Sequence, residues 1–259
     1  MSTPVIIPAK NEAESIGRTL DSLAHQKQEV MPYVIVNDST DRTADIARET
    51  GATVLESEAG KMRAIQEGLR HLGSSAPKPL LILDADTRPL SRRWSRKMTA
   101  ELENLPAEEP AIIWGPYVFK GEISPILGAV ATVAKMRVSW ADRHDQDPRT
   151  IRGGNMGLKL QTADLLEAML ELDNYWPRQD VAVYDKAMEH GANMRVPFHP
   201  DAWAITSGYR ITETIKNILK DRRHPSKIAD TTYSNEAPSN SKPYNSVHSK
   251  RKNKNPGLT

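Results

Sequence analysis

The chain has 259 residues, of which 26% are charged and 38% hydrophobic, and its formal net charge is +2. These values are ordinary for a soluble globular protein, and a balance so close to neutral points to no particular class of partner. The chain has no cysteine, which excludes disulfides and thiolate zinc sites and fits a reducing compartment.

No targeting or membrane-spanning segment is predicted. Residues 1–8 have neither a basic start nor a long apolar run, so they do not look like a signal peptide. The longest apolar segment, residues 123–136, is too short to span a membrane and contains a lysine. We therefore expect a cytoplasmic protein, and this segment leaves peripheral association with the inner face of the membrane open.

Strand and helix signals alternate along residues 1–105. Short runs rich in Val, Ile and Leu predict strands, and apolar residues spaced by three and four predict helices. The predicted strands are residues 4–8, 33–36, 52–55 and 80–83, and the predicted helices are residues 16–23, 62–72 and 94–105. This alternation predicts an α/β fold in which helices flank a mainly parallel central sheet on both faces.

The second half of the chain is less regular. Residues 111–119 predict one strand, followed by a mixed helix to about residue 140 and a polar loop over residues 141–155. Residues 160–172 predict a helix rich in Leu and Met, and another runs from about residue 181 to a stop at Gly191. Residues 194–205 look extended, and residues 225–259 predict a disordered basic tail rich in Ser, Asn, Pro and Lys.

Polar clusters follow three of the predicted strands, after Ile7, Val36 and Leu83. Ligands of parallel α/β sheets bind beyond the carboxyl ends of the strands. The sequence therefore predicts one ligand site built from these clusters.

The segment "LLILDADTRP", residues 80–89, delivers two carboxylates directly after a buried run. In an extended segment residues i and i+2 project to the same side, so Asp84 and Asp86 can share one target. Like charges so close repel unless a cation joins them, and carboxylate oxygens suit Mg²⁺ or Mn²⁺ with positions left for phosphate oxygens. A loop that caps the helix near Ser91 is an equally good interpretation of so short a pattern.

Other candidates at the same edge have two interpretations each. Asp38, in the turn "NDSTDRT", could accept hydrogen bonds from a nucleobase or from the amides of the next helix, and so could Asn11 and Glu12. Lys61 follows Gly60 near a helix start, where a cation could meet a diphosphate or lie in solvent.

Each candidate in the second half of the chain also has two interpretations. Gly153 and Gly154 allow a close backbone approach to a ligand, or simply a tight turn. Asp180 suits a general base or a helix N-cap, with Asp185 as the competing acid. His199 could be a third metal ligand or a surface histidine. Three tryptophans could stack on a sugar or belong to the core: Trp140, Trp176 and Trp203.

The order of four segments is more specific than any of them alone. "PVIIPAKNEAESIGRTLDSL", "VIVNDSTDRTADIARETGATV", "GKMRAIQEGL" and "LLILDADTRP" follow one another over about residues 3–90. In this order they resemble the family 2 glycosyltransferases of the GT-A fold, whose pattern ends in a D-x-D motif. More loosely, "GGNMGLK" and "RQDVAVYDKAMEHGANMRV" are similar to the family's acceptor-side glycine loop and acidic motif segment.

The resemblance implies a GT-A domain over residues 1–224, with a nucleotide-sugar-binding half (1–90) and an acceptor-side half (91–224), before the tail (225–259). It implies a UDP- or GDP-sugar donor, a lipid-linked or saccharide acceptor with a free hydroxyl, and inversion at the anomeric carbon. Nucleic acid is not an expected partner. The Q-x-x-R-W motif and membrane spans of processive synthases are absent, which favours transfer of one sugar in glycolipid, cell-envelope or polysaccharide synthesis.

The same resemblance implies roles for individual residues. Asp86 would bind Mg²⁺ or Mn²⁺ directly, with His199 as a further candidate ligand. Asp180 would be the catalytic base, although it follows Gln179 where the family has Glu. The donor nucleotide would contact Pro8, Ala9, Glu12, Asp38, Lys61 and Asp84. The acceptor would contact Gly153, Gly154, Asn155 and Trp176.

Two other functions compete. A sugar-phosphate nucleotidyltransferase has a similar fold, but it should carry a Gly-rich basic loop after the first strand, which "PAKNEAESIG" does not supply. A non-catalytic nucleotide- or glycan-binding domain of the same fold is favoured by Gln179 and disfavoured by the intact Asp84 and Asp86. Rossmann and P-loop interpretations lose their main support, since neither glycine motif occurs where it should.

Overall fold

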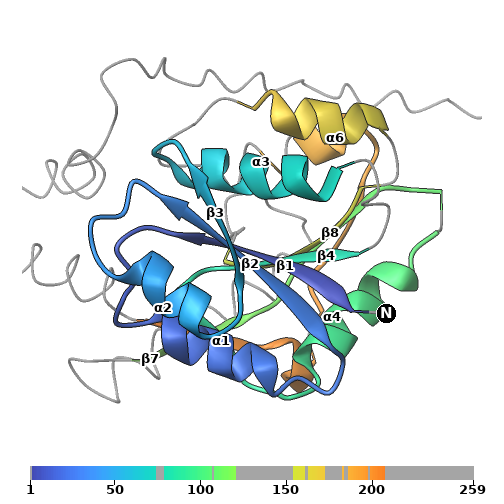
Figure 1. The fold of residues 1–259 in the computed structure, drawn as a ribbon. Helices are drawn as coiled ribbons and strands as arrows, with labels where there is room; N and C mark the ends of the chain where they lie inside the picture. Colours follow the sequence, from blue (N-terminus) through green and yellow to red (C-terminus); the bar gives the residue numbers. More distant parts are fainter. Residues whose placement is uncertain are drawn as a thin grey trace, which may run out of the picture.

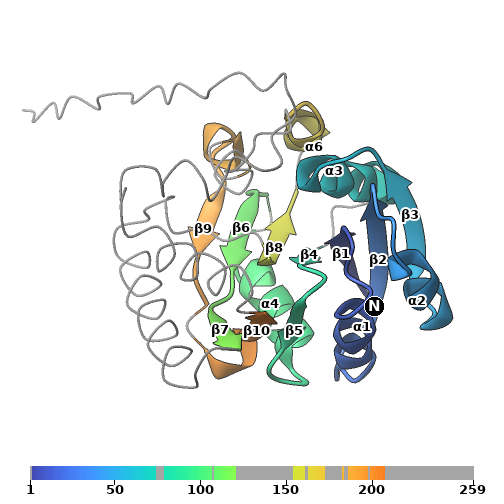
Figure 2. The ribbon, with the colours of Figure 1, turned by 90° about the vertical axis from the view of Figure 1, so that its left-hand side faces the viewer.

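The computed structural model describes residues 2–73, 79–106, 108–120, 154–160, 163–172, 183, 186–197 and 199–207. These residues form a central sheet, helices on both of its faces, and a small second sheet beside it (Figures 1 and 2). The predicted helix before residue 140 and the predicted tail 225–259 lie outside the described residues.

The central sheet runs in the order β3-β2-β1-β4-β8-β6-β9 within the described part of the chain. Its parallel part consists of β1 (Thr3–Ala9), β2 (Val30–Asn37), β3 (Thr53–Ser57) and β4 (Leu80–Leu83). Next to β4 lies β8 (Asn155–Lys159), which is antiparallel to both β4 and β6 (Ala111–Trp114). The last strand, β9 (Asn193–Arg195), is parallel to β6. The sheet is mixed and mostly parallel, and β1, β2 and β4 bring their carboxyl ends to one edge.

Helices cover both faces of this sheet (Figure 1). One face carries α3 (Lys61–Leu72) and α6 (Ala163–Leu170), and the other carries α1 (Ile16–Ala24), α2 (Thr43–Glu49) and α4 (Trp94–Glu103).

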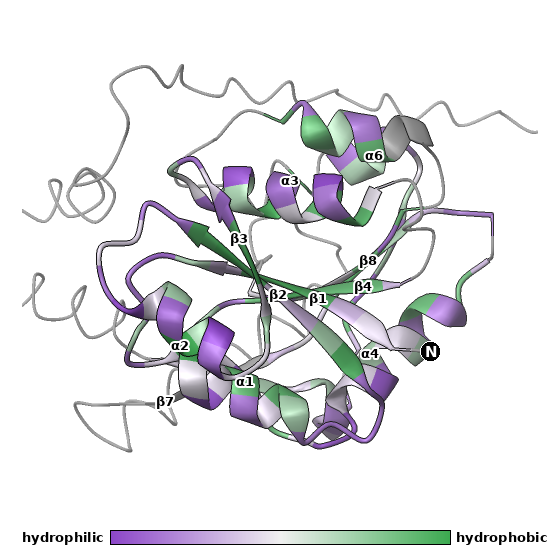
Figure 3. Ribbon diagram, viewed as in Figure 1, coloured by the Kyte–Doolittle hydropathy of each residue, from purple (hydrophilic) through white to green (hydrophobic). Residues whose placement is uncertain are grey.

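Strand β1 shows why both faces need a cover. Its side chains alternate between the faces, so Ile6 packs in the cluster beneath α3 whereas Val5 and Ile7 pack in the cluster beneath α1 and α4. All three are fully buried. In Figure 3 the middle strands are hydrophobic, while the helices carry hydrophilic residues among their hydrophobic ones. Burial on both faces explains the continuous apolar runs of the sequence.

The second sheet contains β5 (Thr87–Pro89), β10 (Ala204–Ser207) and β7 (Tyr117–Lys120), in the order β5-β10-β7 (Figure 2). A short 3₁₀ helix, η3 (Pro200–Ala202), precedes β10. Because β10 is antiparallel to β5, its last residues lie beside the start of β5, directly after Asp86. This sheet brings residues from the end of the described chain to the acidic turn.

The elements predicted over residues 1–105 are confirmed, with ends that differ by a few residues. The strand predicted at 80–83 has the bounds of β4, whereas β2 begins at Val30, before the predicted start. Helix α2 was not predicted, because the turn "NDSTDRT" and the next seven residues carry little apolar periodicity.

The single strand predicted over residues 111–119 is wrong. The chain forms β6, breaks at Gly115 and Pro116, and continues as β7 in the other sheet. At the break a Cβ on Gly115 would lie 2.3 Å from the carbonyl oxygen of Ala202. Only glycine permits so close an approach. Gly115 therefore allows the chain to leave the central sheet after β6 and enter the second sheet as β7.

Strand β8 was also missed, since the sequence predicted a polar loop through residue 155 and a helix from residue 160. Gly157 weakens the strand signal, yet it lets three side chains close in: a Cβ there would lie 3.0–3.1 Å from Ile113, Leu102 and Leu81. The helix that comes next, α6, begins only at Ala163.

Among the described residues no helix is both long and apolar enough to cross a membrane.

Candidate functional site

Asp84 and Asp86 lie in a tight turn directly after β4. The amide of Asp84 donates to the carbonyl oxygen of Gly154 (3.1 Å). The amide of Thr87 donates to the carbonyl oxygen of Asp84 (2.9 Å). The segment is therefore a turn rather than the extended strand that the i, i+2 argument assumes, and its two carboxylates bond to different partners.

The partner of Asp84 is Lys61. The lysine ammonium lies 2.6 Å from a carboxylate oxygen of Asp84, and the two side chains are 26% and 33% exposed. Lys61 is the first residue of α3, and Gly60 before it has a φ of 123°, a conformation that favours glycine. This ion pair ties the end of β4 to the start of α3, so Lys61 is not a solvated surface lysine.

The partners of Asp86 are hydroxyl groups. Thr206 Oγ1 donates to one carboxylate oxygen (3.3 Å), and the hydroxyl of Ser207 donates to the other. The hydroxyl of the adjacent Thr87 also donates to Asp86 (3.2 Å). Both oxygens thus face a polar surface supplied by β5 and β10.

The turns after β1 and β2 are hydrogen-bonded to each other. The amide of Asn11 donates to Ser39 Oγ (3.0 Å), and the amide of Thr40 donates to Oδ1 of Asn11 (2.9 Å). Asn11 and Asp38 have φ angles of 53° and 50°, which are uncommon for residues other than glycine. Strained backbone of this kind concentrates at functional sites. The carboxylate of Asp38 lies 3.3 Å from Lys10 Nζ and is 62% exposed, so a ligand can reach it.

The capping role that the sequence left open belongs to Asp41 rather than to Asp38. One oxygen of Asp41 accepts from the amide of Thr43 at the start of α2 (3.0 Å), and the other accepts from the amide of Ala13 (3.0 Å). Burial acts to raise the pKa of Asp41, but the hydrogen bonds from Thr43 and Ala13 outweigh it, so this pKa falls below its ordinary value of 3.8. The amide of Glu12 donates to Thr43 Oγ1 (2.8 Å), which completes the brace between the two turns.

The other predicted nucleotide-binding residues lie at the same edge. Pro8 and Ala9 are the last residues of β1, are buried, and pair with Ile35 and Val36 of β2. Together with the turns after β1, β2 and β4, they bring the predicted donor residues to one end of the sheet.

Two of the predicted acceptor residues lie beside the acidic turn. Gly154 accepts the amide of Asp84, and Asn155 begins β8. The side chain of Asn155 is fully buried: its Oδ1 accepts from Trp94 Nε1 (2.9 Å), and its Nδ2 donates to the carbonyl oxygen of Ala202 (3.0 Å). These bonds tie α4 and η3 to β8, so we do not carry Asn155 into the proposed acceptor site.

His199 lies away from Asp86. It precedes η3 and the start of β10, whereas Asp86 meets the last residues of that strand. Its Nδ1 accepts from the amide of Asp201 (3.1 Å) and so caps η3. The structure does not bring His199 to Asp86, and we leave it out of the proposed metal site.

Several candidates lie outside the described residues. They are Trp140, Gly153, Trp176, Asp180 and Asp185.

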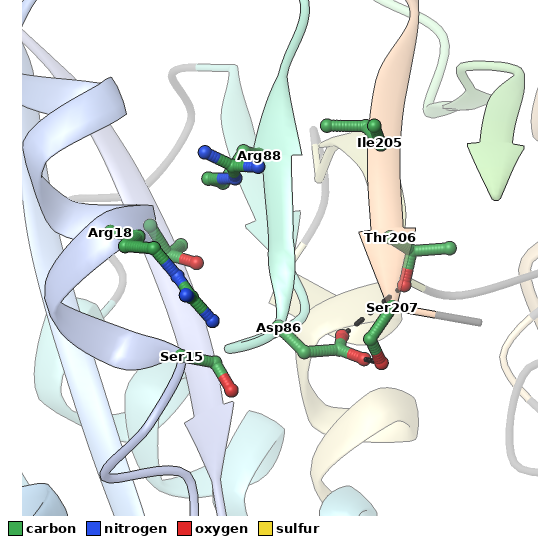
Figure 4. A pocket seen from close by; sticks show the side chains of 8 residues that line it. Ser15, Arg18, Asp86, Arg88, Ile205, Thr206 and Ser207 are labelled. Atoms are coloured by element: carbon green, nitrogen blue, oxygen red, sulfur yellow. Dashed lines mark hydrogen bonds between the residues drawn. The ribbon is translucent and has the colours of Figure 1, made fainter. Parts of the chain in front are cut away.

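A pocket opens next to Asp86, between α1 and the strands β5 and β10 (Figure 4). Sequence reasoning missed its other members, which are Ser15, Arg18, Thr19, Arg88, Ile205, Thr206 and Ser207. A signal existed for Arg88, since it follows Asp86 by two residues in "DADTRP". None existed for Thr206 and Ser207, which only the pairing of β10 with β5 brings here.

The donor atoms at Asp86 suit a hard divalent cation. Carboxylate and hydroxyl oxygens are ligands that Mg²⁺ and Mn²⁺ accept, usually while keeping waters or phosphate oxygens in the remaining positions. Within the described ranges no three His, Asp or Glu side chains gather tightly enough to enclose an ion. The donor atoms that the described residues present at Asp86 therefore fit a hard divalent ion.

Residues 5–119 match the family described as glycosyl transferase family 2. They form a glycosyl transferase family 2 domain. This domain contains β1 to β4, the acidic turn, and the Lys61–Asp84 pair.

Curated relatives match short parts of the chain. The 4,4'-diaponeurosporenoate glycosyltransferase of Staphylococcus haemolyticus is 51% identical over 53 residues, which are 20% of this chain and 14% of that protein. The enzyme of the same name from a bovine strain of Staphylococcus aureus is 37% identical over 92 residues, which are 33% of this chain and 24% of that protein. The chain thus matches a quarter or less of the length of these relatives.

A solved structure supports the fold of the family 2 domain and of the strands after it. The mannosyltransferase from Pyrobaculum calidifontis, in complex with GDP-Man and Mn²⁺, aligns with a TM-score of 0.53 and 18% sequence identity. The alignment covers 86% of this chain and 65% of that one. The fold is GT-A-like, with a mixed and mostly parallel sheet, as the sequence predicted.

Proposed function

We propose that this protein is a metal-dependent inverting glycosyltransferase that moves one sugar from a UDP- or GDP-sugar to an acceptor hydroxyl. The observation that carries the proposal is the acidic turn at the carboxyl end of β4, inside a glycosyl transferase family 2 domain. There Asp84 is paired with Lys61, while Asp86 opens into a polar pocket. Ligands of α/β sheets bind at this edge.

Asp86 would hold Mg²⁺ or Mn²⁺. When bound, such an ion stabilises the negative charge that grows on the leaving diphosphate. The mannosyltransferase of similar fold is described with Mn²⁺ and GDP-Man, which supports the same pair of ligands for this chain.

The chain's own residues would bind and orient the donor. The exposed carboxylate of Asp38 would accept hydrogen bonds from the nucleoside, with Pro8, Ala9 and Glu12 around it. Lys61 would fix the orientation of Asp84 and place a positive charge beside the diphosphate.

On the acceptor side, Asp180 is the proposed general base, with Asp185 as the alternative. Its carboxylate would take the proton of the acceptor hydroxyl as that oxygen attacks the anomeric carbon from the face opposite the diphosphate. One displacement inverts the configuration. Gly153, Gly154 and Trp176 are the proposed acceptor contacts.

We keep a lipid-linked and a saccharide acceptor within the proposal. The staphylococcal relatives are named for glycosyl transfer to 4,4'-diaponeurosporenoate, which supports an acceptor other than a growing polysaccharide. A cytoplasmic enzyme that associates peripherally with the membrane, and works in envelope or glycolipid synthesis, fits this chemistry.

A panel of nucleotide sugars tests the donor. Thermal unfolding of the full chain is followed with UDP- and GDP-sugars, each with Mn²⁺, with Mg²⁺ and with EDTA. A ligand that binds the folded state raises the unfolding temperature by mass action, so the true donor should stand out only when metal is present.

Product analysis then decides the reaction. The selected donor should be hydrolysed slowly or transferred to added acceptors, with release of nucleoside diphosphate. If no nucleotide sugar is turned over by a protein that binds one, the non-catalytic interpretation replaces this proposal. Pyrophosphate release from nucleoside triphosphate and sugar phosphate would establish nucleotidyl transfer instead.

A further inference from the structure

Two arginines line the pocket beside Asp86. Arg18 lies on the exposed side of α1, and Arg88 is a partly buried residue of β5. Figure 4 shows both side chains reaching the space between α1 and β5, with Asp86 at its edge.

Within the described part of the chain, neither guanidinium has an ion pair or side-chain hydrogen bond. The other arginines of the family 2 domain include several that do: Arg42 pairs with Glu49 at 3.3 Å, and Arg63 pairs with Glu58 at 3.3 Å. Asp86, the one carboxylate among the described residues that line the pocket, accepts hydrogen bonds from hydroxyl groups instead. The pocket therefore concentrates unpaired cationic donors.

The charge and the donor set of this pocket suit an oxyanion. Among the described lining residues, two guanidinium groups and one carboxylate leave a net positive charge, and a divalent ion at Asp86 would increase it. Guanidinium groups bind phosphate and carboxylate through paired N–H donors. The hydroxyl of Ser15, which also lines the pocket, already donates to Glu12 Oε2 (2.8 Å), so the two arginines supply the donors for an anion. An anion would also relieve the repulsion between two like charges in one pocket.

We infer that this pocket is an oxyanion-binding site in which Arg18 and Arg88 bind a phosphate or carboxylate group of a substrate next to Asp86. Two sources fit this chemistry, namely the diphosphate of the donor and an acidic group on the acceptor. Neither Lys61 nor Asp84 lines the pocket, so this site is distinct from the Lys61–Asp84 ion pair. Only the choice of source rests on the proposed function, because anion binding itself requires no transfer.

The test monitors the arginine Nε–H signals of the full chain by NMR. Signals of Arg18 and Arg88 are assigned by their loss in the Arg18→Lys and Arg88→Lys variants. The protein is titrated, without metal, with inorganic pyrophosphate, inorganic phosphate and acetate. Both signals should shift selectively, and Arg18→Gln and Arg88→Gln should each weaken pyrophosphate binding about tenfold. Arg96→Gln, which changes an exposed arginine of α4 outside the pocket, is the matched control and should bind as the parent does.

Titrations with UDP and GDP separate the two sources. If the nucleoside diphosphates shift the same signals and bind about tenfold more weakly to both glutamine variants, the donor diphosphate occupies the pocket. If phosphate or acetate still shifts these signals at saturating UDP or GDP, the pocket takes an acidic group of the acceptor. The inference is overturned if no anion shifts Arg18 and Arg88 selectively, or if Arg96→Gln loses as much affinity. A protein that transfers no sugar would still give one of these readings, so the two proposals fail separately.

Discussion

The ammonium group of Lys61 lies 2.6 Å from the carboxylate of Asp84, across the gap between the start of α3 and the end of β4. The pair is only partly exposed, so removing one member leaves the other charge poorly solvated. It therefore couples the packing of α3 to the position of the acidic turn.

We expect Lys61→Met to lower the free energy of unfolding by about 1 kcal/mol and to weaken donor binding about tenfold. A double-mutant cycle with Asp84→Asn, measured by urea unfolding, should return a coupling of about 1 kcal/mol. The matched control is Lys186→Met with Glu189→Gln, an ion pair of 2.8 Å whose glutamate is 62% exposed. Its coupling should be about 0.3 kcal/mol. Equal couplings in the two cycles would show that Lys61 and Asp84 behave as an ordinary surface pair.

We expect metal-dependent activity to require the carboxylate of Asp86. Asp86→Asn keeps the size of the side chain and one acceptor oxygen but loses the negative charge, so kcat should fall about 1,000-fold, as expected when stabilisation of several kcal/mol is lost. EDTA should inactivate the parent protein, and Mn²⁺ should restore the parent but not the variant. Asp45→Asn, which changes an exposed carboxylate of α2, is the control and should leave kcat unchanged. Metal-dependent activity in the Asp86→Asn variant would place the ion elsewhere.

The brace between the turns after β1 and β2 should make stability depend on pH in the acid range. The pKa of Asp41 is lowered in the folded protein, so its stabilisation is fully present above 3.8 and is lost as the pH falls through the lowered value. The stability difference between the parent and Asp41→Asn, measured by urea unfolding, should therefore shrink as the pH falls below 3.8. A difference that stays constant over this range would mean that the hydrogen bonds from Thr43 and Ala13 do not favour the ionised carboxylate.

A substitution at Gly115 tests the link between β6 in the central sheet and β7 in the second sheet. Gly115→Ala places a methyl group 2.3 Å from the carbonyl oxygen of Ala202 and from Asn155 Nδ2, so the backbone must move. We expect a loss of about 2–3 kcal/mol in unfolding free energy, at the upper end for overpacking because a backbone atom is hit. Gly51→Ala is the comparison for glycine loss without a clash, since nothing lies within 4 Å of a Cβ there, although its φ of 81° adds strain of its own. A Gly115→Ala protein as stable as the parent would mean that η3 can move aside freely.

The sequence predicted the parallel half of the fold well because its signal is local. Fully buried strands such as β4 read as continuous apolar runs, and the polar residues after them meet at one edge by the geometry of parallel sheets. Asp84, Asp38 and Lys61 were predicted as donor-binding residues from such runs of a few residues, and the structure places them near this edge of the sheet.

The missed features depend on contacts between distant segments. Two of the three hydroxyls that donate to Asp86, those of Thr206 and Ser207, come from residues 120 and 121 positions later in the chain. Asn155 looked like a ligand residue because its partners, Trp94 Nε1 and the carbonyl oxygen of Ala202, are 61 and 47 residues away. The local pattern of a glycine-rich loop cannot reveal that its asparagine fills a buried junction between α4, β8 and η3.

Because β10 pairs with β5, the pocket beside Asp86 can form only after β10 has been synthesised. The acidic turn and Thr87 leave the ribosome early, but Thr206 and Ser207, whose hydroxyls also donate to Asp86, are synthesised 120 and 121 residues after Asp86. A fragment that ends at Lys120 would contain the whole family 2 match, yet it would lack β8, which lies between β4 and β6, and β10, which closes the pocket. The segment that identifies the family is therefore not a unit that can assemble its own site, and each nascent chain gains a complete Asp86 pocket only after its later strands have docked.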